Sequence, residues 1–169
     1  MDCILFRHGI AAEWSDWSGN DKDRPLTKEG RDKTRQGAKG LRHLGIHPTH
    51  ILCSPFLRTQ QTAEILKDVL QFSGSLQYCP ELFSEASPHQ LFTLLAPFPK
   101  KSIVMCVGHE PHLGHTAAAM LCGQPLQGMS MKKAGACLMQ FHGVPERGEG
   151  MLQWWLEPNQ LRSLGTLSS

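Results

Sequence analysis

Short runs of apolar residues, each bounded by turn-forming or polar residues, recur along the chain and predict six β-strands. The first and fourth runs are almost continuously apolar, which is typical of central strands that are covered on both faces. The last two runs follow Gly128 and are separated by the turn-like segment VPERGEG, so we expect a hairpin or an antiparallel edge there. The six runs are Asp2 to Phe6, Thr49 to Cys53, Leu76 to Tyr78, Ser102 to Val107, Ala136 to Phe141 and Met151 to Leu156.

Helical patterns lie between these strands. The first predicted helix has Thr27 as its N-cap and Gly45 at its C-terminal stop, although its apolar stripe is thin. The third begins at Ser87-Pro88, where a capping side chain precedes a proline at the first helical position. The predicted helices run from Thr27 to about Leu44, from about Phe56 to Leu70, from Ser87 onward, and from about Pro111 to Leu121.

Strands that alternate with helices over the first 120 residues indicate an α/β sandwich with a mostly parallel sheet. Its crossover connections are expected to be right-handed, because strand twist favours that hand. The segment from Ala11 to Arg24, directly after the first strand, is the most loop-like region. The tail after Pro158 is expected to be loosely held.

Length and composition place the chain among ordinary globular proteins. A length of 169 residues fits one domain, spanning 1–169, and a hydrophobic share of 40% is sufficient for a core. No apolar run approaches the ~18 residues that span a bilayer, and Arg7 and His8 interrupt the only candidate signal peptide. The net charge of +2 is mild, and the Lys and Arg residues form no stripe. We therefore expect a cytoplasmic protein that binds neither nucleic acid nor a membrane.

The cysteines occur singly, without the C-x-x-C pairs that indicate zinc sites or redox motifs. Four of them fall inside predicted strands, where a free thiol packs as a small hydrophobic group. We interpret them as core residues of a protein in a reducing compartment. The six are Cys3, Cys53, Cys79, Cys106, Cys122 and Cys137.

Arginine and histidine side chains follow three of the predicted strands. Arg7 and His8 come after the first strand, Arg58 lies in the first turn of the helix after the second, and His109 comes after the fourth. Each could be a solvated strand end. However, the carboxyl ends of parallel strands meet at one edge of a sheet, where α/β proteins bind ligands. We therefore expect these four side chains to converge.

The chemistry of these side chains suits a phosphoryl group. Arginine binds two phosphate oxygens through its planar fork and stays charged. A neutral imidazole can attack phosphorus when a hydrogen bond holds its other nitrogen in the right tautomer. Gly9 would let the backbone approach His8 closely. Helices beginning after Ser54-Pro55 and Glu110-Pro111 would add backbone N–H groups and positive dipole ends.

Four motifs, in order along the chain, resemble the histidine phosphatase superfamily, and most closely its short, SixA-type phosphohistidine phosphatases. RHG alone would be weak evidence, whereas the ordered set is specific. The resemblance implies a phosphoglycerate mutase-like fold, which is a three-layer α/β/α sandwich with a mixed, mostly parallel sheet. The motifs are RHG at 7–9, RPLTKEGR at 24–31, SPFLRTQQTAE at 54–64 and VGHEPHLG at 107–114.

The resemblance also implies roles for the four side chains. His8 would be the nucleophile that is transiently phosphorylated, and Arg7, Arg58 and His109 would complete the phosphate pocket. Water would then attack phospho-His8 and release inorganic phosphate, without a metal or other cofactor. The implied substrate is a phosphorylated histidine of a phosphorelay or phosphocarrier protein.

The proton donor for the leaving group stays open. Larger relatives carry an acidic residue in an insertion after the third strand, where this chain has only PELFSEASP, with Glu81 and Glu85. Glu85 could equally be a loop carboxylate that faces water. An imidazole leaves more easily than an alkoxide, so a weak or missing acid favours phosphohistidine over an ester. We assign Arg24, in the second motif, to organising the start of the helix rather than to catalysis.

Two alternatives keep the phosphate site. A general phosphatase for small esters such as sugar phosphates would have the same fold and motifs. A phosphate-binding module without catalysis would keep Arg7 and Arg58 but would not need His8.

Two further alternatives fit the spacing poorly. Cys53 and Arg58 form C-x4-R, one residue short of the C-x5-R loop that resemblance to the cysteine-dependent phosphatases would require. A metal site at His109, His112 and His115 would depart from the H-E-x-x-H spacing of zinc proteases. We interpret His112 and His115 as helix-surface residues, with His112 near the rim of the pocket.

Overall fold

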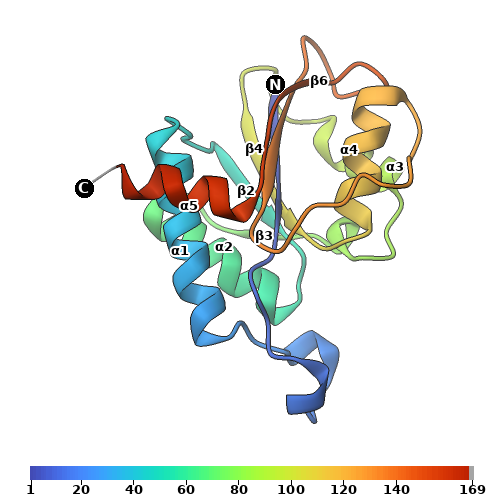
Figure 1. The fold of residues 1–169 in the computed structure, drawn as a ribbon. Coiled ribbons are helices and arrows are strands. Elements are labelled where there is room, and N and C mark those ends of the chain that lie inside the picture. Colours follow the sequence, from blue (N-terminus) through green and yellow to red (C-terminus); the bar gives the residue numbers. More distant parts are fainter. Residues whose placement is uncertain (168–169) are drawn as a thin grey trace.

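The computed structural model describes residues 1–167 and contains one six-stranded sheet with the order β3-β2-β4-β1-β5-β6 (Figure 1). Residues 168 and 169, which end the expected domain and tail, lie outside the described residues. The pairs β1-β4, β4-β2 and β2-β3 are parallel, whereas β1-β5 and β5-β6 are antiparallel. The predicted mixed, mostly parallel sheet with an antiparallel edge is therefore confirmed. The strands are β1 Asp2–Arg7, β2 His50–Cys53, β3 Gln77–Tyr78, β4 Ile103–Gly108, β5 Ala136–Gln140 and β6 Met151–Leu156.

Helices cover both faces of the sheet and produce three layers (Figure 1). On one side α1, α2 and α5 pack against Ile4 and Phe6 of β1, and on the other α3 and α4 pack against Cys3 and Leu5. Successive side chains of a strand point to opposite faces, so both faces of β1 are apolar because both are buried. The helices are α1 Lys28–His43, α2 Leu57–Val69, α3 Pro88–Leu95, α4 His112–Cys122 and α5 Pro158–Thr166, and the short 3-10 helices are η1 Trp14–Asp16, η2 Asp21–Asp23 and η3 Pro80–Leu82.

The cysteines are free thiols, as expected. The four in strands are completely buried and belong to the two halves of the core, and Cys79 is buried beside them. Cys122, at the end of α4, is exposed. Most of these residues thus act as small apolar core groups.

The segment after Pro158 is a helix, so the expectation of a loosely held tail was wrong. Glu157 and Gln160 form a capping box at the start of α5, and Leu161 is fully buried against α1. The part of α1 that contacts Leu161 of α5 includes Gly37 and Gly40. A Cβ at Gly40 would lie 2.0 Å from the carbonyl oxygen of Leu161. The thin apolar stripe of the α1 sequence therefore marks a close helix crossing rather than a weakly packed helix.

Replacing Gly40 by alanine is expected to lower the free energy of unfolding by about 2 kcal/mol, because the added methyl group would force the helices apart. Gly37→Ala is the matched control, since its Cβ would lie 3.7 Å from the Cβ of Leu161, an ordinary contact distance. That variant should be neutral or more stable by up to about 1 kcal/mol, because alanine favours a helix. Urea denaturation measures both, and equal effects would contradict the close crossing.

Candidate active site

The predicted site residues come together where β1, β2 and β4 end. Arg7 is the last residue of β1 and pairs with Gly108 of β4, so His8 and His109 follow side by side. Their ring centroids are 5.1 Å apart. Arg58 arrives from the first turn of α2, after β2, and its guanidinium lies 4.8 Å over the ring of Phe56, which also contacts His109. The parallel register thus explains the convergence that the sequence predicted.

His8 is a buried, neutral imidazole with a defined tautomer. Its Nδ1 lies 2.7 Å from the carbonyl oxygen of Gly9, and since a carbonyl only accepts, Nδ1 carries the proton. Burial lowers the pKa of His8 to about 3, against the raising effect of the Gly9 carbonyl, and the charges of Arg58, Arg7 and Lys133 lower it further. Nε2 therefore keeps its lone pair at ordinary pH, as a nucleophilic nitrogen must.

Gly9 is needed for a reason that the sequence did not show. A Cβ there would lie 2.3 Å from the hydroxyl oxygen of Thr34 on α1. Its N–H donates to the hydroxyl of Thr62 on α2, at 3.0 Å. The backbone of Gly9 therefore approaches α1 and α2 closely, and these two helices hold the turn that carries His8.

The second histidine, His109, is also buried and neutral. Its Nε2 is hydrogen-bonded to the hydroxyl of Ser54, at 2.9 Å. Its Nδ1 is buried and has no hydrogen-bond partner in the described part of the chain. Burial is the main cause of its strongly lowered pKa, and the neighbouring His8 and Arg58 lower it further.

Arg58 is held by Asp21, a residue that the sequence did not single out. Nη1 donates to both the backbone oxygen and Oδ1 of Asp21, at 2.8 and 3.1 Å, and Nη2 donates to Oδ2 at 3.1 Å. Burial alone would raise the pKa of Asp21, but Arg24 and Arg58 hold it below its usual range. Both terminal nitrogens are thus engaged, whereas the buried Nε of Arg58 has no partner among residues 1–167.

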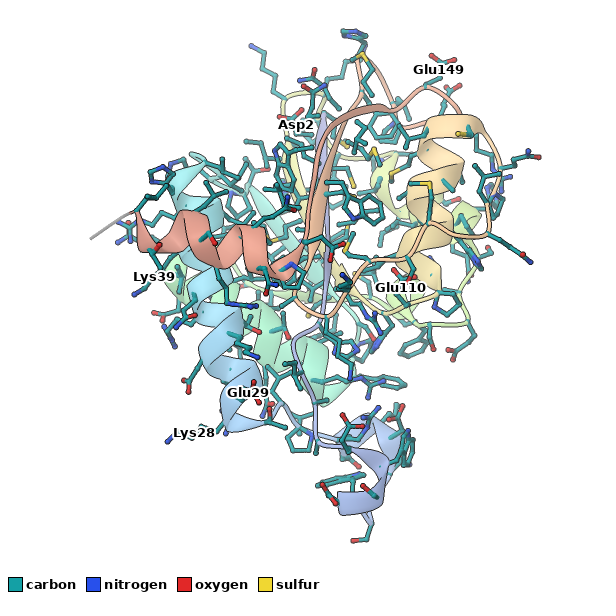
Figure 2. The ribbon with its side chains drawn as sticks, in the orientation of Figure 1. Asp2, Lys28, Glu29, Lys39, Glu110 and Glu149 are labelled. Carbon is teal, nitrogen blue, oxygen red and sulfur yellow. The ribbon has the colours of Figure 1, made fainter. Side chains whose placement is uncertain are left out.

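Arg7 is held from the other side. Its Nη1 donates to the backbone oxygen of Met131 at 2.6 Å, and the N–H of Met131 donates to Glu110 at 3.0 Å. Glu110 is half-buried, whereas Lys28 and Glu29 at the start of α1 are exposed (Figure 2 labels all three). Burial raises the pKa of Glu110, and its carboxyl in turn supports the charge of Arg7. Glu110 therefore positions the loop that anchors Arg7.

Three nitrogen atoms of this site are buried and lack a hydrogen-bond partner among the described residues. They are Nε of Arg7, Nε of Arg58 and Nδ1 of His109. Buried polar groups are almost always hydrogen-bonded, so this set indicates a place where a ligand supplies acceptor atoms. Two guanidinium donors beside a neutral imidazole suit a tetrahedral oxyanion such as phosphate.

The remaining acidic and basic candidates lie elsewhere. The sequence analysis assigned Arg24 to organising the start of α1. In the structure, its Nη1 instead donates to the backbone oxygen of Ala12, and its guanidinium lies over the ring of Trp14. It therefore holds the segment 11–24 together and, through Asp21, the orientation of Arg58. Glu85 is exposed and accepts a hydrogen bond from Ser84, and Glu81 lies half-buried in η3. Neither shares a hydrogen bond with the four site residues among the contacts the structure describes.

His112 is buried, so its assignment to the helix surface was wrong. Its Nε2 is hydrogen-bonded to Thr116, at 3.3 Å, inside the core that α4 forms with α3. Within residues 1–167, no three His, Cys, Asp or Glu side chains are grouped so that they could hold a metal ion. In the same part of the chain, none of the helices combines the length and apolar character that crossing a membrane requires.

The cysteine alternative has little physical support. Cys53 is fully buried, and burial raises the pKa of its thiol to about 12. A thiol attacks phosphorus as the thiolate, which this pKa makes scarce at neutral pH.

The buried histidines predict how stability depends on pH. Burial lowers the pKa of His8, of His109 and of His112, the last to about 4. In the unfolded chain these groups bind protons below about pH 6.5. The unfolded state then binds more protons than the folded state. The free energy of unfolding should therefore fall below about pH 6.5, by up to about 1.4 kcal/mol per pH unit for each histidine.

Urea denaturation at about pH 7, 6 and 5 measures this slope. His112→Asn should make the slope shallower, whereas substitution of the exposed His142 by asparagine serves as the control. The same slope for both variants would contradict the burial argument.

Comparisons with known proteins agree with this geometry. Residues 3–83 match the family model described as the histidine phosphatase superfamily, branch 1. An uncharacterised protein of Picosynechococcus is 40% identical over 142 residues, which cover 80% of this chain and 82% of that protein. Phosphohistidine phosphatase SixA of Escherichia coli is 29% identical over 164 residues, or 96% of this chain and 97% of SixA. The structure of the protein histidine phosphatase SixA with tungstate superposes with a TM-score of 0.83 and 27% identity, covering 95% of this chain and 99% of that one.

Proposed function

The chain belongs to the histidine phosphatase superfamily and is a phosphatase, and on that premise we propose that it dephosphorylates a histidine of a signalling or carrier protein. The reaction would pass through a covalent phospho-His8 intermediate, with a phosphorelay or phosphocarrier protein as the partner. One observation supports this most: buried nitrogens without a partner among the described residues belong to Arg7, Arg58 and His109, the side chains grouped with His8, whose Nε2 keeps a free lone pair.

In the proposed first step, Nε2 of His8 attacks phosphorus and the P–N bond of the substrate breaks. Arg7 and Arg58 offset the charge on the phosphoryl oxygens as that bond breaks. The leaving imidazole departs neutral when its other ring nitrogen already carries a proton. A water molecule then attacks phospho-His8, which restores the free imidazole and releases inorganic phosphate.

The acidic residues around the site favour this substrate over a small ester. An alkoxide must gain a proton as it leaves, and general acid catalysis of that kind contributes about 10²- to 10⁴-fold. Asp21 is committed to Arg58 and Arg24, and Glu110 accepts from Met131. Glu85 faces solvent. A leaving imidazole needs no such acid.

The names of the relatives point the same way. The Escherichia coli relative is a phosphohistidine phosphatase, and the solved relative is a protein histidine phosphatase that binds tungstate, a tetrahedral oxyanion. The six free thiols suit a reducing compartment, and we place the protein in the cytoplasm.

Rapid-quench kinetics with a radiolabelled phosphohistidine peptide, alongside p-nitrophenyl phosphate and a sugar phosphate, tests the proposal. We expect acid-labile, base-stable label on the enzyme in the first turnover. The kcat/KM for phosphohistidine should exceed that for the sugar phosphate by about 10²-fold or more, because the site offers the leaving alkoxide no proton donor. Faster turnover of the sugar phosphate would establish the small-ester alternative, and binding without any hydrolysis would establish the phosphate-binding module.

A further inference from the structure

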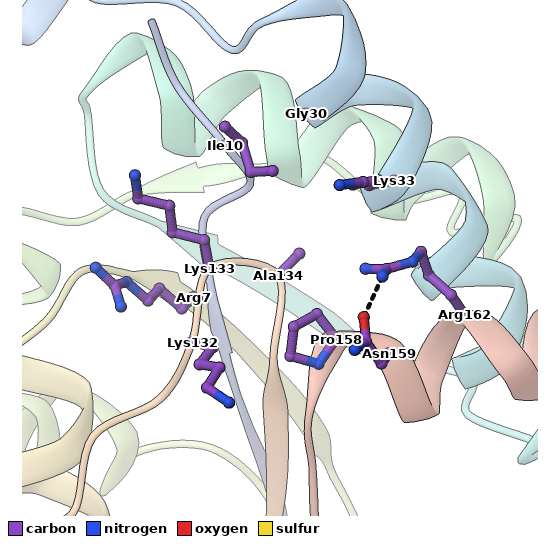
Figure 3. A pocket seen from close by; sticks show the side chains of 10 residues that line it. All are labelled: Arg7, Ile10, Gly30, Lys33, Lys132, Lys133, Ala134, Pro158, Asn159 and Arg162. Carbon is purple, nitrogen blue, oxygen red and sulfur yellow. Dashed lines mark hydrogen bonds between the residues drawn. The ribbon is translucent and has the colours of Figure 1, made fainter. Parts of the chain in front are cut away.

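A second cavity, of about 410 Å³, lies beside the candidate active site, between the first turns of α1, the loop before β5 and the start of α5 (Figure 3). Five cationic side chains line it, namely Arg7, Lys33, Lys132, Lys133 and Arg162. None of the residues lining it is acidic. The charge of the cavity therefore favours an anionic ligand.

The arrangement of the lining suits an acidic side chain rather than a bare anion. Lys33 and Arg162 lie on one side of the cavity, and Arg7 and Lys133 lie on the other (Figure 3). Between them, Ile10 contributes apolar surface together with Ala134 and Pro158. The methylene groups of a glutamate could pack on this surface while its carboxylate meets the cations.

The cations have partners that a ligand could replace. Lys33 pairs with Glu29, and Lys133 lies 3.9 Å from Glu13. Lys132 pairs with Glu157 at 2.8 Å, and since that carboxylate is only 35% exposed, Lys132 is the least available of the cations. The side chains of Glu29 and Glu13 are 64% and 67% exposed, and exposed ion pairs are weak. Arg162 donates to the amide oxygen of Asn159, which is uncharged.

The cavity shares one residue with the site that carries His8. Arg7 belongs to both, because it lines the cavity and also presents an unpartnered Nε in the active site. The N–H of Ala134 lies 3.1 Å from the backbone oxygens of both Arg7 and His8. The segment that carries Lys132 and Lys133 is thereby fixed to the backbone of the proposed nucleophile.

We propose that this cavity binds the carboxylate of an acidic residue that lies near the phosphohistidine in the protein substrate. The inference rests on the proposed function and specifies its substrate: a phosphohistidine with glutamate or aspartate close by. A carboxylate on a small phosphoester has the same chemistry, so the test includes 3-phosphoglycerate as a separate substrate.

The test compares two phosphohistidine peptides that differ only in having glutamates or glutamines around the histidine. The variant Lys33→Gln/Arg162→Gln removes two cations of the cavity that take no part in the proposed chemistry. The matched control Lys39→Gln/Arg42→Gln removes two exposed cations of α1 that do not line the cavity. Lys39 projects from the outside of α1 (Figure 2).

For the glutamate peptide, we expect the cavity variant to lower kcat/KM about fivefold to tenfold, mainly through KM. The glutamine peptide should change less than about twofold, and so should both peptides with the control variant. Added NaCl should reduce the advantage of the glutamate peptide, because salt screens these charges.

Equal kcat/KM for the two peptides on the unsubstituted protein would overturn the inference and leave the proposed function intact. Preferred turnover of 3-phosphoglycerate, dependent on Lys33 and Arg162, would overturn the protein source of the carboxylate.

A second measurement separates this inference from the proposed function. The unphosphorylated glutamate peptide should inhibit hydrolysis of p-nitrophenyl phosphate, and inhibition should weaken about fivefold to tenfold in the Lys33→Gln/Arg162→Gln variant. If phosphohistidine peptides are not hydrolysed but this inhibition is seen, the substrate assignment fails and the carboxylate site stands. Equal inhibition of the cavity variant and the control variant would overturn the carboxylate site.

Discussion

Replacing His8 by alanine is expected to abolish turnover, with kcat lower by about 10⁴-fold or more, because the variant has no atom that can accept the phosphoryl group. Steady-state hydrolysis of the phosphohistidine peptide measures the effect. His142→Ala, at an exposed position, should leave kcat unchanged.

The same variant also tests the covalent intermediate. Radiolabel should appear on the unsubstituted enzyme after rapid quench and should be missing from His8→Ala. The removal of a buried imidazole could alter folding, so circular dichroism and phosphate binding should accompany the kinetics. Normal hydrolysis by folded His8→Ala would refute the assignment of the nucleophile.

Arg58→Ala is expected to lower kcat/KM by about 10²- to 10³-fold, because it removes a charged donor from the phosphoryl oxygens in the transition state. Arg58 also connects η2 to α2 through Asp21, so the loss could have a structural component. Asp21→Asn separates the two contributions. This variant weakens the hydrogen bonds between residue 21 and Arg58 but leaves the guanidinium in the site, and we expect kcat/KM to fall about tenfold.

Thermal melts of both variants complete this comparison. If Arg58→Ala lost no more activity than Asp21→Asn, the guanidinium would act by holding the loop rather than by binding phosphate. A larger loss for Arg58→Ala, at similar thermal stability, is the expected result.

Much of the fold follows from local patterns in the sequence. The runs that become β1 and β4 are apolar at nearly every position because helices cover both faces, and this is the signal that identified them. Thr27 accepts a hydrogen bond from the N–H of Gly30, and Gly45 follows with a positive φ of 73°, so both ends of α1 were readable. The convergence of the site residues then followed from the parallel register.

Features that depend on residues far away in the sequence could not be predicted from it. The segment 11–24 holds several carboxylates, and only the tertiary fold selects Asp21 as the one that reaches Arg58. The helix α5 was missed because its contact surface on α1 includes the backbone of Gly40, which leaves no apolar pattern in the sequence. His112 was placed on the surface because a histidine in a helix is usually solvated, whereas α4 is buried on nearly every side.

The position of β1 in the sheet has a consequence for the synthesis of the protein. β1 leaves the ribosome before both of its neighbours in the sheet, β4 and β5, which begin only at residues 103 and 136. Arg7 and His8 are thus translated well before the two strands that hold β1, and they reach their folded positions only after β5 has emerged. A nascent chain that stops before β5 would carry all four sequence motifs and still be unable to hold His8, the proposed nucleophile, in place.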